Sequence, residues 1–321
     1  MILHRRTLLV STLGAMAASG AAAQAKWPDK PVKLVVGFTP GSATDVSGRL
    51  FAQKFSELWG QTVIVDNVPG NSGAIGVDRV AKAAPDGYTL MWTGNAAVTI
   101  LPSLQKLPFD PVKDFAHIST TLVTGSVIMV NNDLPVKTLA DLVAHAKANP
   151  GKLSYGSPGV GTPQHIAGEL LSKIAGIKME HVPYRGAQLT DTMSGVVPVA
   201  IQNAGASMPL IRDGRLRGLA VTSLKRSGAA PNLPTVAEQG FPGFEAASWF
   251  ALLAPAGTPQ SILDKVRDAS LKVLADKAIL AKLQALGLDP VGSTGAETKA
   301  QIEKDIPKWA QVIKDAGIPR N

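Results

Sequence analysis

Short apolar runs alternate with segments of helical periodicity along most of this chain, and that alternation constrains the fold more than any other feature. Each run is bounded by turn residues, which predicts buried strands at Val32–Phe38, Val63–Val65 and Tyr88–Thr93. The helix predicted after the first strand carries four apolar residues near one face: Val46, Leu50, Phe55 and Leu58. A second helix is predicted over Ile75–Ala84. Strands that alternate with helices in this way form parallel sheets, so the predicted fold class is α/β.

Two apolar segments without a helix between their halves interrupt the alternation. One is Phe115–Asn131, which divides near Gly125, and the other is Ala246–Leu253. The 321 residues are too many for one comfortable core, so we interpret both segments as crossings between two domains. We expect a discontinuous lobe one (26–122 and 250–321) and a continuous lobe two (123–249), with a ligand cleft between them.

The second half of the chain repeats the strand and helix pattern. Thr138 and Asp141 have the spacing of a capping box for a helix that ends at Ala148. Four strands are expected to follow: Leu153–Gly156, Glu180–Val182, Val197–Ile201 and Leu216–Val221. Thr258 and Pro259 predict the N-cap and first residue of a helical stretch with core positions at Leu263, Val266, Leu274 and Leu283. The two halves share no fixed sequence period, so we expect any pseudo-symmetry to be structural.

The first 25 residues have the form of a cleavable export signal. Arg5 and Arg6 precede an apolar run, and small residues follow as far as Ala25. The run is shorter than the roughly 20 residues that a bilayer requires, which argues against a permanent anchor. We expect cleavage near Ala25 and export to the periplasm, and the paired arginines leave both the general and the twin-arginine route open.

Composition excludes several classes of function. The chain has no cysteine and only five histidines, so we expect no disulfide, no metal site and no thiolate chemistry. Without the first 25 residues, 30 Lys and Arg face 24 Asp and Glu, and the basic residues are dispersed. Nucleic-acid binders carry clustered basic residues, so we expect no nucleic-acid partner.

Three loops that follow predicted strands share glycine, hydroxyl and amide residues. In α/β sheets such loops lie where ligands bind, and helix N-termini favour anions. Ser42 and Asp45 have capping-box spacing, Thr162 precedes Pro163 as a predicted N-cap, and Asn95 is predicted to cap. The candidate ligand residues in these loops are Phe38, Gly41, Ser42, Thr44, Asp45, Asn95, Ala96, Ser157, Gly159, Gly161, Thr162 and His165. Tyr184, Gln202 and Asn203 follow later strands and complete the candidate set.

Each loop taken alone is also compatible with an ordinary capped turn. His165 is predicted either to cap or donate to ligand, or to be a packing histidine, while His117, His145 and His181 are interpreted as structural. Arg185 is the cation of a candidate loop and could pair with a ligand carboxylate, but a solvated position at a helix start is favoured. Trp249 and Phe250 are expected to pack the second crossing rather than to line the cleft.

Enzyme motifs are missing from the sequence. It contains no G-x-S-x-G and no H-E-x-x-H, and Thr162 stands where a phosphate-binding loop requires lysine. A secreted hydrolase that uses Ser or Asp residues therefore remains only as an alternative. An extracytoplasmic sensor for a signalling partner is a further alternative, because it would use the same kind of cleft.

Six runs resemble the Bug-type periplasmic receptors of tripartite tricarboxylate transporters. They are Asp66–Gly70, Gly73–Gly76, Pro85–Leu90, Phe109–Phe115, Leu233–Glu238 and Gly240–Glu245. The resemblance spans the mature chain and implies a two-lobed flytrap fold. It also implies a receptor that delivers organic carboxylates to membrane permease subunits, with no catalysis and no cofactor. In that family the glycine and hydroxyl loops of both lobes hold a carboxylate, partly through bridging waters. We expect a monomer.

Two positions depart from the family pattern. The family often has glycine where Ser42 stands, and often has aspartate after a lobe-two strand where this chain has Gln202 and Asn203. A buried ammonium group needs a carboxylate partner, which two amides do not supply. The sequence therefore predicts a carboxylate ligand without an amino group; the alternative is that Gln202 and Asn203 point away from the ligand. The candidate loops contain several small polar residues and only Arg185 as a cation, so we expect loop amides and hydroxyls to hold the carboxylate more than a salt bridge does.

Overall fold

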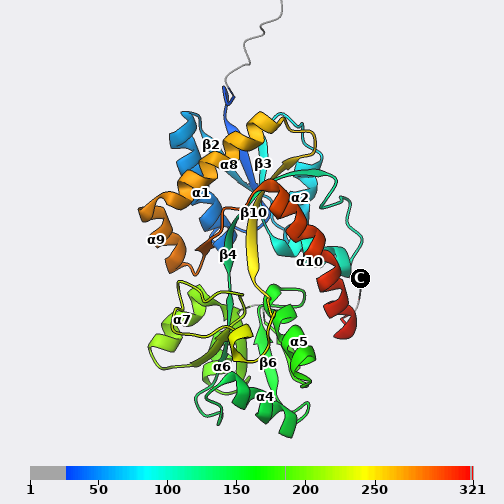
Figure 1. Ribbon diagram of the computed structural model, residues 1–321, viewed down its shortest axis with the longest axis vertical. Coiled ribbons are helices and arrows are strands. Elements are labelled where there is room, and N and C mark those ends of the chain that lie inside the picture. Colours follow the sequence, from blue (N-terminus) through cyan, green and yellow to red (C-terminus); the bar gives the residue numbers. More distant parts are fainter. Residues whose placement is uncertain (1–26, 185, 319, 321) are drawn as a thin grey trace, which may run out of the picture.

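The computed structural model describes residues 27–184, 186–318 and 320. Two sheets with helices on both sides form two lobes along the long axis of the molecule (Figure 1). The predicted export signal and Arg185 lie outside the described residues. No helix within the described part is long and apolar enough to span a membrane.

Lobe one is built on a six-stranded sheet with the strand order β11-β4-β10-β3-β1-β2. Its strands are β1 (Val32–Val36), β2 (Val63–Asn67), β3 (Thr89–Gly94), β4 (Phe115–Thr124), β10 (Ser248–Pro255) and β11 (Asp289–Pro290). Its helices are α1 (Ala43–Trp59), α2 (Ala74–Ala81), α3 (Leu101–Leu104), α8 (Gln260–Ala275), α9 (Lys277–Ala285) and α10 (Gly295–Asp315). Strands β1, β2 and β3 are parallel, as the alternation predicts.

Lobe two is built on a five-stranded sheet with the order β7-β6-β8-β5-β9. Its strands are β5 (Ser126–Val130), β6 (Ser154–Ser157), β7 (Glu180–Pro183), β8 (Val199–Asn203) and β9 (Arg217–Val221). Its helices are α4 (Leu139–Ala148), α5 (Pro163–Ala175), α6 (Gln188–Met193) and α7 (Ala204–Arg212). The predicted capping box of Thr138 and Asp141 is present at the start of α4.

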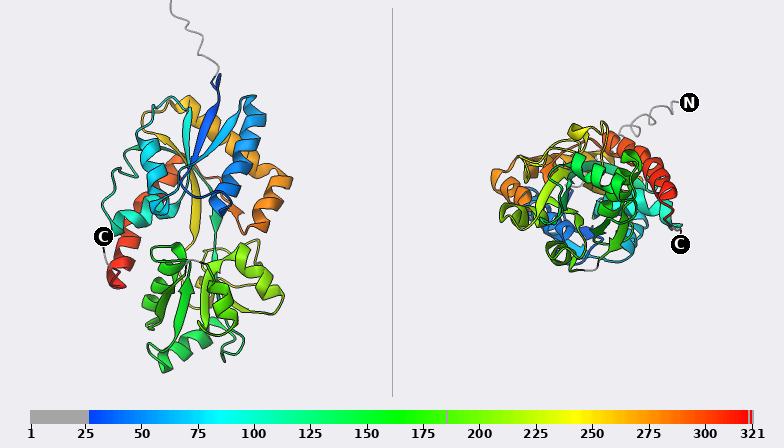
Figure 2. Two further views of the ribbon diagram at one scale, coloured as in Figure 1. Left: turned by 180° about the vertical axis from the view of Figure 1, so that it is seen from behind. Right: turned by 90° about the horizontal axis from the view of Figure 1, so that it is seen from below.

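Both lobe-to-lobe connections run through extended chain at the middle of the molecule, and α10 extends from lobe one alongside lobe two (Figure 2). The chain changes sheet between Thr124 and Ser126, and returns to the first sheet at Ser248. The lobe boundaries expected at 122/123 and 249/250 therefore fall inside β4 and β10.

Several local predictions were wrong. In α1, Phe55 is buried as predicted, but Leu58 is 38% exposed, and the buried face also includes Ser47 and Phe51. The reason is that Gly48 lets the helix approach the indole of Trp92. Thr258 does not cap α8, because its hydroxyl donates to the Pro255 carbonyl and the helix begins at Gln260.

The helical stretch predicted after Thr258 and Pro259 consists of two helices, α8 and α9, as far as Ala285. It breaks at Asp276, whose carboxylate caps α9 by accepting from two backbone N–H groups. Leu263, Val266 and Leu283 are buried as predicted, and Leu274 is partly buried. Trp249 and Phe250 are buried, as expected for packing residues, and the Trp249 indole N–H donates to Asp305 at 3.0 Å.

Candidate functional site

The strand-end loops of the two lobes lie at the level of the crossings. In lobe one, Gly94 at the end of β3 pairs with Phe250 near the start of β10. In lobe two, Asn203 at the end of β8 pairs with Ser126, the first residue of β5. Because β1 is parallel to β3 and β6 is parallel to β8, the loops after all four strands are directed toward the other lobe.

The lobe-one loop is organised around the carboxylate of Asp45. Ser42 is the N-cap of α1, and its hydroxyl accepts from the Asp45 N–H at 3.2 Å. The carboxylate does not complete a capping box. It accepts instead from the Gly41 N–H at 2.8 Å and from Asn67 Nδ2 at 2.8 Å, and it forms an ion pair with Arg49 at 2.9 Å.

Asp45 is therefore a charged but internally neutralised group. Burial opposes its ionisation, but hydrogen bonds from Arg49, Gly41 and Asn67 outweigh that effect and hold the pKa of its carboxyl below the usual value. The Asp45 side chain is 3% exposed, whereas its charge partner Arg49 is 51% exposed and reaches the carboxylate from the solvent side. Asn67 also donates to the Phe38 carbonyl at 3.0 Å and thereby ties the loop to β2.

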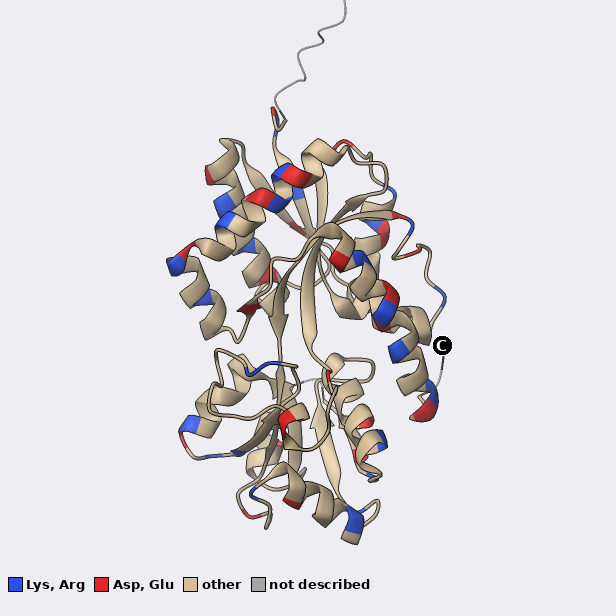
Figure 3. Cartoon of the chain, in the orientation of Figure 1, with Lys and Arg blue, Asp and Glu red and all other residues tan. Residues whose placement is uncertain are grey.

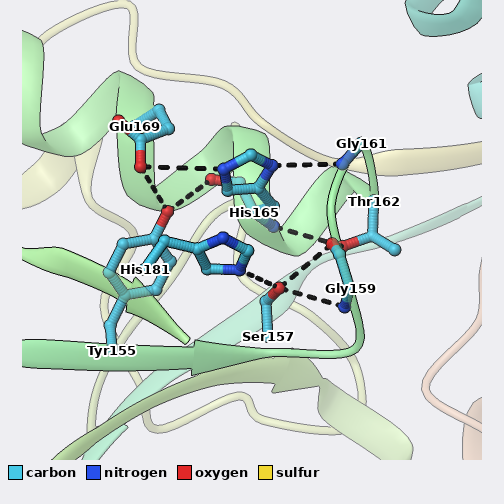
Figure 4. A network of polar contacts seen from close by, with 8 residues as sticks. All are labelled: Tyr155, Ser157, Gly159, Gly161, Thr162, His165, Glu169 and His181. Atoms are coloured by element: carbon cyan, nitrogen blue, oxygen red, sulfur yellow. Dashed lines mark hydrogen bonds and ion pairs between the residues drawn. The ribbon is translucent and has the colours of Figure 1, made fainter. Parts of the chain in front are cut away.

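The lobe-two loop has the same backbone frame around a histidine (Figure 4). Thr162 is the N-cap of α5, with Pro163 at the first helical position as predicted. Its hydroxyl accepts from the His165 N–H at 3.3 Å and donates to the Gly159 carbonyl at 2.7 Å. The Gly161 N–H donates to His165 Nδ1 at 3.1 Å, so the proton of the neutral ring is on Nε2.

His165 stacks on His181, with ring centroids 3.8 Å apart and an interplanar angle of 19°. Burial, and in second place the neighbouring His181, lowers the pKa of His165 to about 3. Burial alone lowers the pKa of His181 to about 4. Both rings are therefore neutral near pH 7, and the 3.8 Å approach of His165 Nε2 to Glu169 is not an ion pair there.

Three further side chains complete the buried network drawn in Figure 4. Ser157 Oγ lies 2.6 Å from His181 Nε2 and accepts from the Gly159 N–H at 3.2 Å. The Tyr155 hydroxyl contacts Glu169 Oε1 at 2.7 Å. Burial raises the pKa of Glu169, and this bond opposes the shift only in part. Through Ser157 and His165, this network is hydrogen-bonded to the backbone of the Gly159–Thr162 loop and supports its conformation.

The two loops are built from equivalent ten-residue segments. Gly41–Leu50 reads GSATDVSGRL and Gly161–Leu170 reads GTPQHIAGEL. Gly41 and Gly161 both have positive φ, at 82° and 76°, and each donates its N–H to the side chain four residues later. Gly48 and Gly168 occupy matching positions where a Cβ would press on an aromatic ring of the adjacent strand, Trp92 or Tyr155. The pseudo-symmetry is thus structural, as expected, but it leaves a short trace in the sequence.

Four amide side chains form a second cluster at the end of the lobe-two sheet. Gln202 Nε2 donates to Gln188 Oε1 at 3.1 Å, and Gln202 Oε1 accepts from the Asn203 N–H at 2.9 Å. Gln188 Nε2 donates to the carbonyls of Gly156 and Ile201. Gln164 Nε2 donates to Asn203 Oδ1. The hydrogen bonds of the two predicted amides are therefore made to other amide groups and to the backbone.

The structure places the other predicted residues in different roles. Asn95 does not cap the following turn, because its side-chain amide donates a hydrogen bond of 3.2 Å to the Ala247 carbonyl in the second crossing. Ala96 begins that turn and is partly buried, and Thr44 is buried in the first turn of α1. The Tyr184 hydroxyl donates to Asp191 at 2.9 Å, and its ring lies over Gly156.

Sequence reasoning missed most of the supporting residues: Arg49, Asn67, Tyr155, Glu169, Gln164, Gln188 and His181. His181 was interpreted as structural, and its contacts are those of a supporting residue: it stacks on His165 and lies within hydrogen-bond distance of Ser157. The equivalence of Gly41–Leu50 and Gly161–Leu170 could have identified Arg49 and Glu169, which occupy matching positions. The described residues contain no group of three metal-ligating side chains.

Charged side chains are spread over the outer helices of both lobes, and the strands that run between the lobes carry few of them (Figure 3). Two α/β lobes, each with glycine-containing loops at the strand ends that are directed toward the other lobe, form the architecture of a solute-binding protein. Proteins of this class close on a small ligand.

Comparison with known proteins identifies the family. Residues 48–318 match the tripartite tricarboxylate transporter family receptor, and the chain belongs to that family. It is 34% identical to Protein BugT of Bordetella pertussis over 322 residues, covering 97% of this chain and 98% of that protein. Among solved structures, an adipate-bound R. palustris protein is 36% identical, with a TM-score of 0.77 and coverage of 91% and 99%. The malate-bound MatC of Rhodopseudomonas palustris is 26% identical, with a TM-score of 0.73 and coverage of 89% and 100%.

The family consists of solute-binding receptors rather than enzymes, so the hydrolase alternative is not supported. The structure does bring Ser157 and His181 within 2.6 Å, a contact that the sequence did not predict. Ser157 is fully buried, and its oxygen also accepts from the loop backbone. The pair therefore has the contacts of a loop support.

Proposed function

We propose that this receptor captures a small organic carboxylate without an amino group in the periplasm and delivers it to the permease subunits of a tripartite tricarboxylate transporter. In this proposal residues 1–25 are removed on export, the mature chain acts as a monomer, and the ligand lies between the strand-end loops of the two lobes. The predicted residues of both loops then form its surroundings.

The observation that carries this proposal is the charge difference between the two helix N-termini. The first turn of α1 contains Asp45, so an internal carboxylate already occupies the position that favours an anion. The first turn of α5 contains no acidic residue, and neutral His165 stands at the equivalent place. A ligand carboxylate should therefore bind at the start of α5, with its other end directed toward lobe one.

The amide cluster supports a ligand without an ammonium group. Gln202 and Asn203 form hydrogen bonds with neutral partners, and amides donate and accept but do not neutralise a cation. Asp45 is already paired with Arg49, so it is not free to serve as the counter-charge. An unpaired ammonium in a closed cleft would cost several kcal/mol.

The family and its solved members point the same way. The matched family is named for tricarboxylate transport, and two of the solved relatives hold adipate and malate, which are dicarboxylates without an amino group. These ligands are the first candidates for this chain.

A thermal-shift and calorimetric screen of the mature protein tests the proposal. The panel should contain succinate, adipate, malate, aromatic mono- and dicarboxylates, aspartate and glutamate. A ligand that binds only the folded state raises the melting temperature by mass action, so at least one non-amino carboxylate should do so. Tighter binding of aspartate or glutamate than of every non-amino acid would contradict the proposed ligand class. Co-purification with permease subunits tests the delivery step.

A further inference from the structure

The two crossings are held together on their lobe-one side by strand pairing. Strands β4 and β10 form an antiparallel ladder that runs from Phe115↔Pro255 to Thr124↔Ser248. In each crossing, one residue separates this last pair from the residue that is bonded to lobe two, which is Ser126 in the first crossing and Ala246 in the second. The separating residues are Gly125 in the first crossing and Ala247 in the second.

On the lobe-two side, Thr222 ties the two crossings to each other. Its hydroxyl accepts from the Ser126 N–H at 2.9 Å and donates to the Ala246 carbonyl at 3.0 Å. Its backbone N–H donates to the Ser126 carbonyl at 2.9 Å, and its carbonyl accepts from the Ala246 N–H at 2.9 Å. Thr222 is fully buried, so these four bonds fix Ser126 and Ala246 to β9 away from solvent.

The carbonyls of the two intervening residues are also anchored, but to opposite lobes. The Gly125 carbonyl accepts from the Ala204 N–H of lobe two at 3.3 Å, and also from the hydroxyl of the preceding residue, Thr124, at 3.3 Å. The Ala247 carbonyl accepts from Asn95 of lobe one at 3.2 Å. Peptide units are planar, so each anchored carbonyl fixes the whole unit to which it belongs.

We propose that rotation between the lobes is confined to the φ and ψ torsions of Gly125 and Ala247, and that Thr222 is the positioning residue that confines it. The peptide unit before Gly125 moves with lobe one and the unit after it moves with lobe two. For Ala247 the lobes are exchanged. The peptide unit before it moves with lobe two, because Thr222 holds the Ala246 carbonyl, and the unit after it moves with lobe one, because Asn95 holds the Ala247 carbonyl. This inference holds whichever ligand the cleft takes.

Removal of the Thr222 hydroxyl should release Ser126 and Ala246 and extend the hinge. Thr222→Val preserves the shape of the side chain but leaves a buried N–H and a buried carbonyl without their partner. The chain has no cysteine, so cysteines introduced at exposed Ile75 and Val196 report the interlobe distance through two spin labels. We expect a broader distance distribution in the ligand-free variant than in the wild type, and recovery of the wild-type width in Thr222→Ser.

Thr192→Val is the matched control, because Thr192 is equally buried in lobe two and its hydroxyl bonds only to the Gln188 carbonyl of its own helix. A Thr222→Val distribution that superimposes on the wild type, or equal broadening in Thr192→Val, would overturn the proposal. If Thr222→Val does not fold, amide hydrogen exchange of the wild type decides the question. Ser126 and Ala246 should then exchange slowly and Gly125 and Ala247 rapidly, and equal exchange at all four amides would exclude a two-residue hinge.

Discussion

The Gly41–Leu50 loop of lobe one and the Gly161–Leu170 loop of lobe two share one backbone frame and differ in the side chain that the frame holds. In each loop a glycine with positive φ donates to the side chain four residues later, and a hydroxyl residue caps the helix. Lobe one places the ion pair of Asp45 and Arg49 in this frame, whereas lobe two places neutral His165 beside Glu169. Under the proposed function, the backbone frame sets where a ligand approaches the loop, and the side chain inside the frame sets which ligand charge is accepted there.

A carboxylate placed at position 165 in the lobe-two loop should have the largest effect on ligand affinity. His165→Asp would give α5 the internal anion that α1 already has. We expect binding of the best carboxylate from the screen to weaken roughly tenfold or more, since each factor of ten corresponds to about 1.4 kcal/mol. Isothermal titration calorimetry measures this change. His165→Asn, which stays neutral, is the control, and equal weakening in both variants would contradict a charge effect.

Acid should destabilise lobe two, because two buried histidine rings there resist protonation in the folded state. The pKa values of His165 and His181 are lowered to about 3 and about 4. The unfolded chain therefore binds protons at these rings from about pH 6.5 downward, while the folded chain does not. This stability is fully present above about pH 6.5 and is lost progressively as the pH falls from there through the folded-state pKa values of about 4 and about 3. The raised pKa of Glu169 acts in the opposite direction and offsets part of this loss.

Urea unfolding at pH 7 and pH 5 measures how much unfolding free energy the protein loses in acid. His181→Gln should lose less stability between the two values than the wild type does. His145→Gln, at the end of α4 and outside the network, should behave as the wild type. An unchanged pH dependence in His181→Gln would show that the ring does not control acid stability.

The capping hydroxyls should have smaller effects, and these should differ between the lobes. Ser42→Ala and Thr162→Val each remove an N-cap acceptor, which typically costs about 1 kcal/mol of unfolding free energy. Thr162→Val should also weaken ligand binding, because the hydroxyl holds the Gly159 carbonyl. It should weaken binding more than Arg185→Ala does. A silent threonine change together with loss of binding in the arginine variant would refute the preference for loop groups over a salt bridge.

Gln202→Asp should produce the smallest change in ligand affinity. It tests whether a negative charge added to lobe two changes which ligands the protein accepts. A carboxylate at this position can neutralise an ammonium group, so affinity for aspartate or glutamate should appear or rise while the fold is preserved. Gln202→Glu tests whether reach matters, and Gln202→Asn is the neutral control. Equal amino-acid affinity in the aspartate and asparagine variants would show that residue 202 does not face the ligand.

Prediction from the sequence succeeded where the signal is local. The strand and helix alternation, the capping box at Thr138 and the N-cap at Thr162 depend on residues within one or two turns, and the structure confirms them. It failed where a partner comes from another element. Asn95 was expected to cap and instead bonds to Ala247, which is 152 residues away in the sequence. The role of His181 depends on Ser157 and His165, which belong to other elements.

The sequence by itself determined the α/β class, the two crossings and the glycine and hydroxyl chemistry of the loops, because backbone preference and hydrophobic periodicity are properties of neighbouring residues. Only the tertiary structure decided which loop is charged and which is neutral. Asp45 is neutralised by Arg49 and held by Asn67, while burial, and in second place His181, keeps the His165 ring neutral. Charge state depends on desolvation and on groups brought together by folding, and neither can be read from the order of residues along the chain.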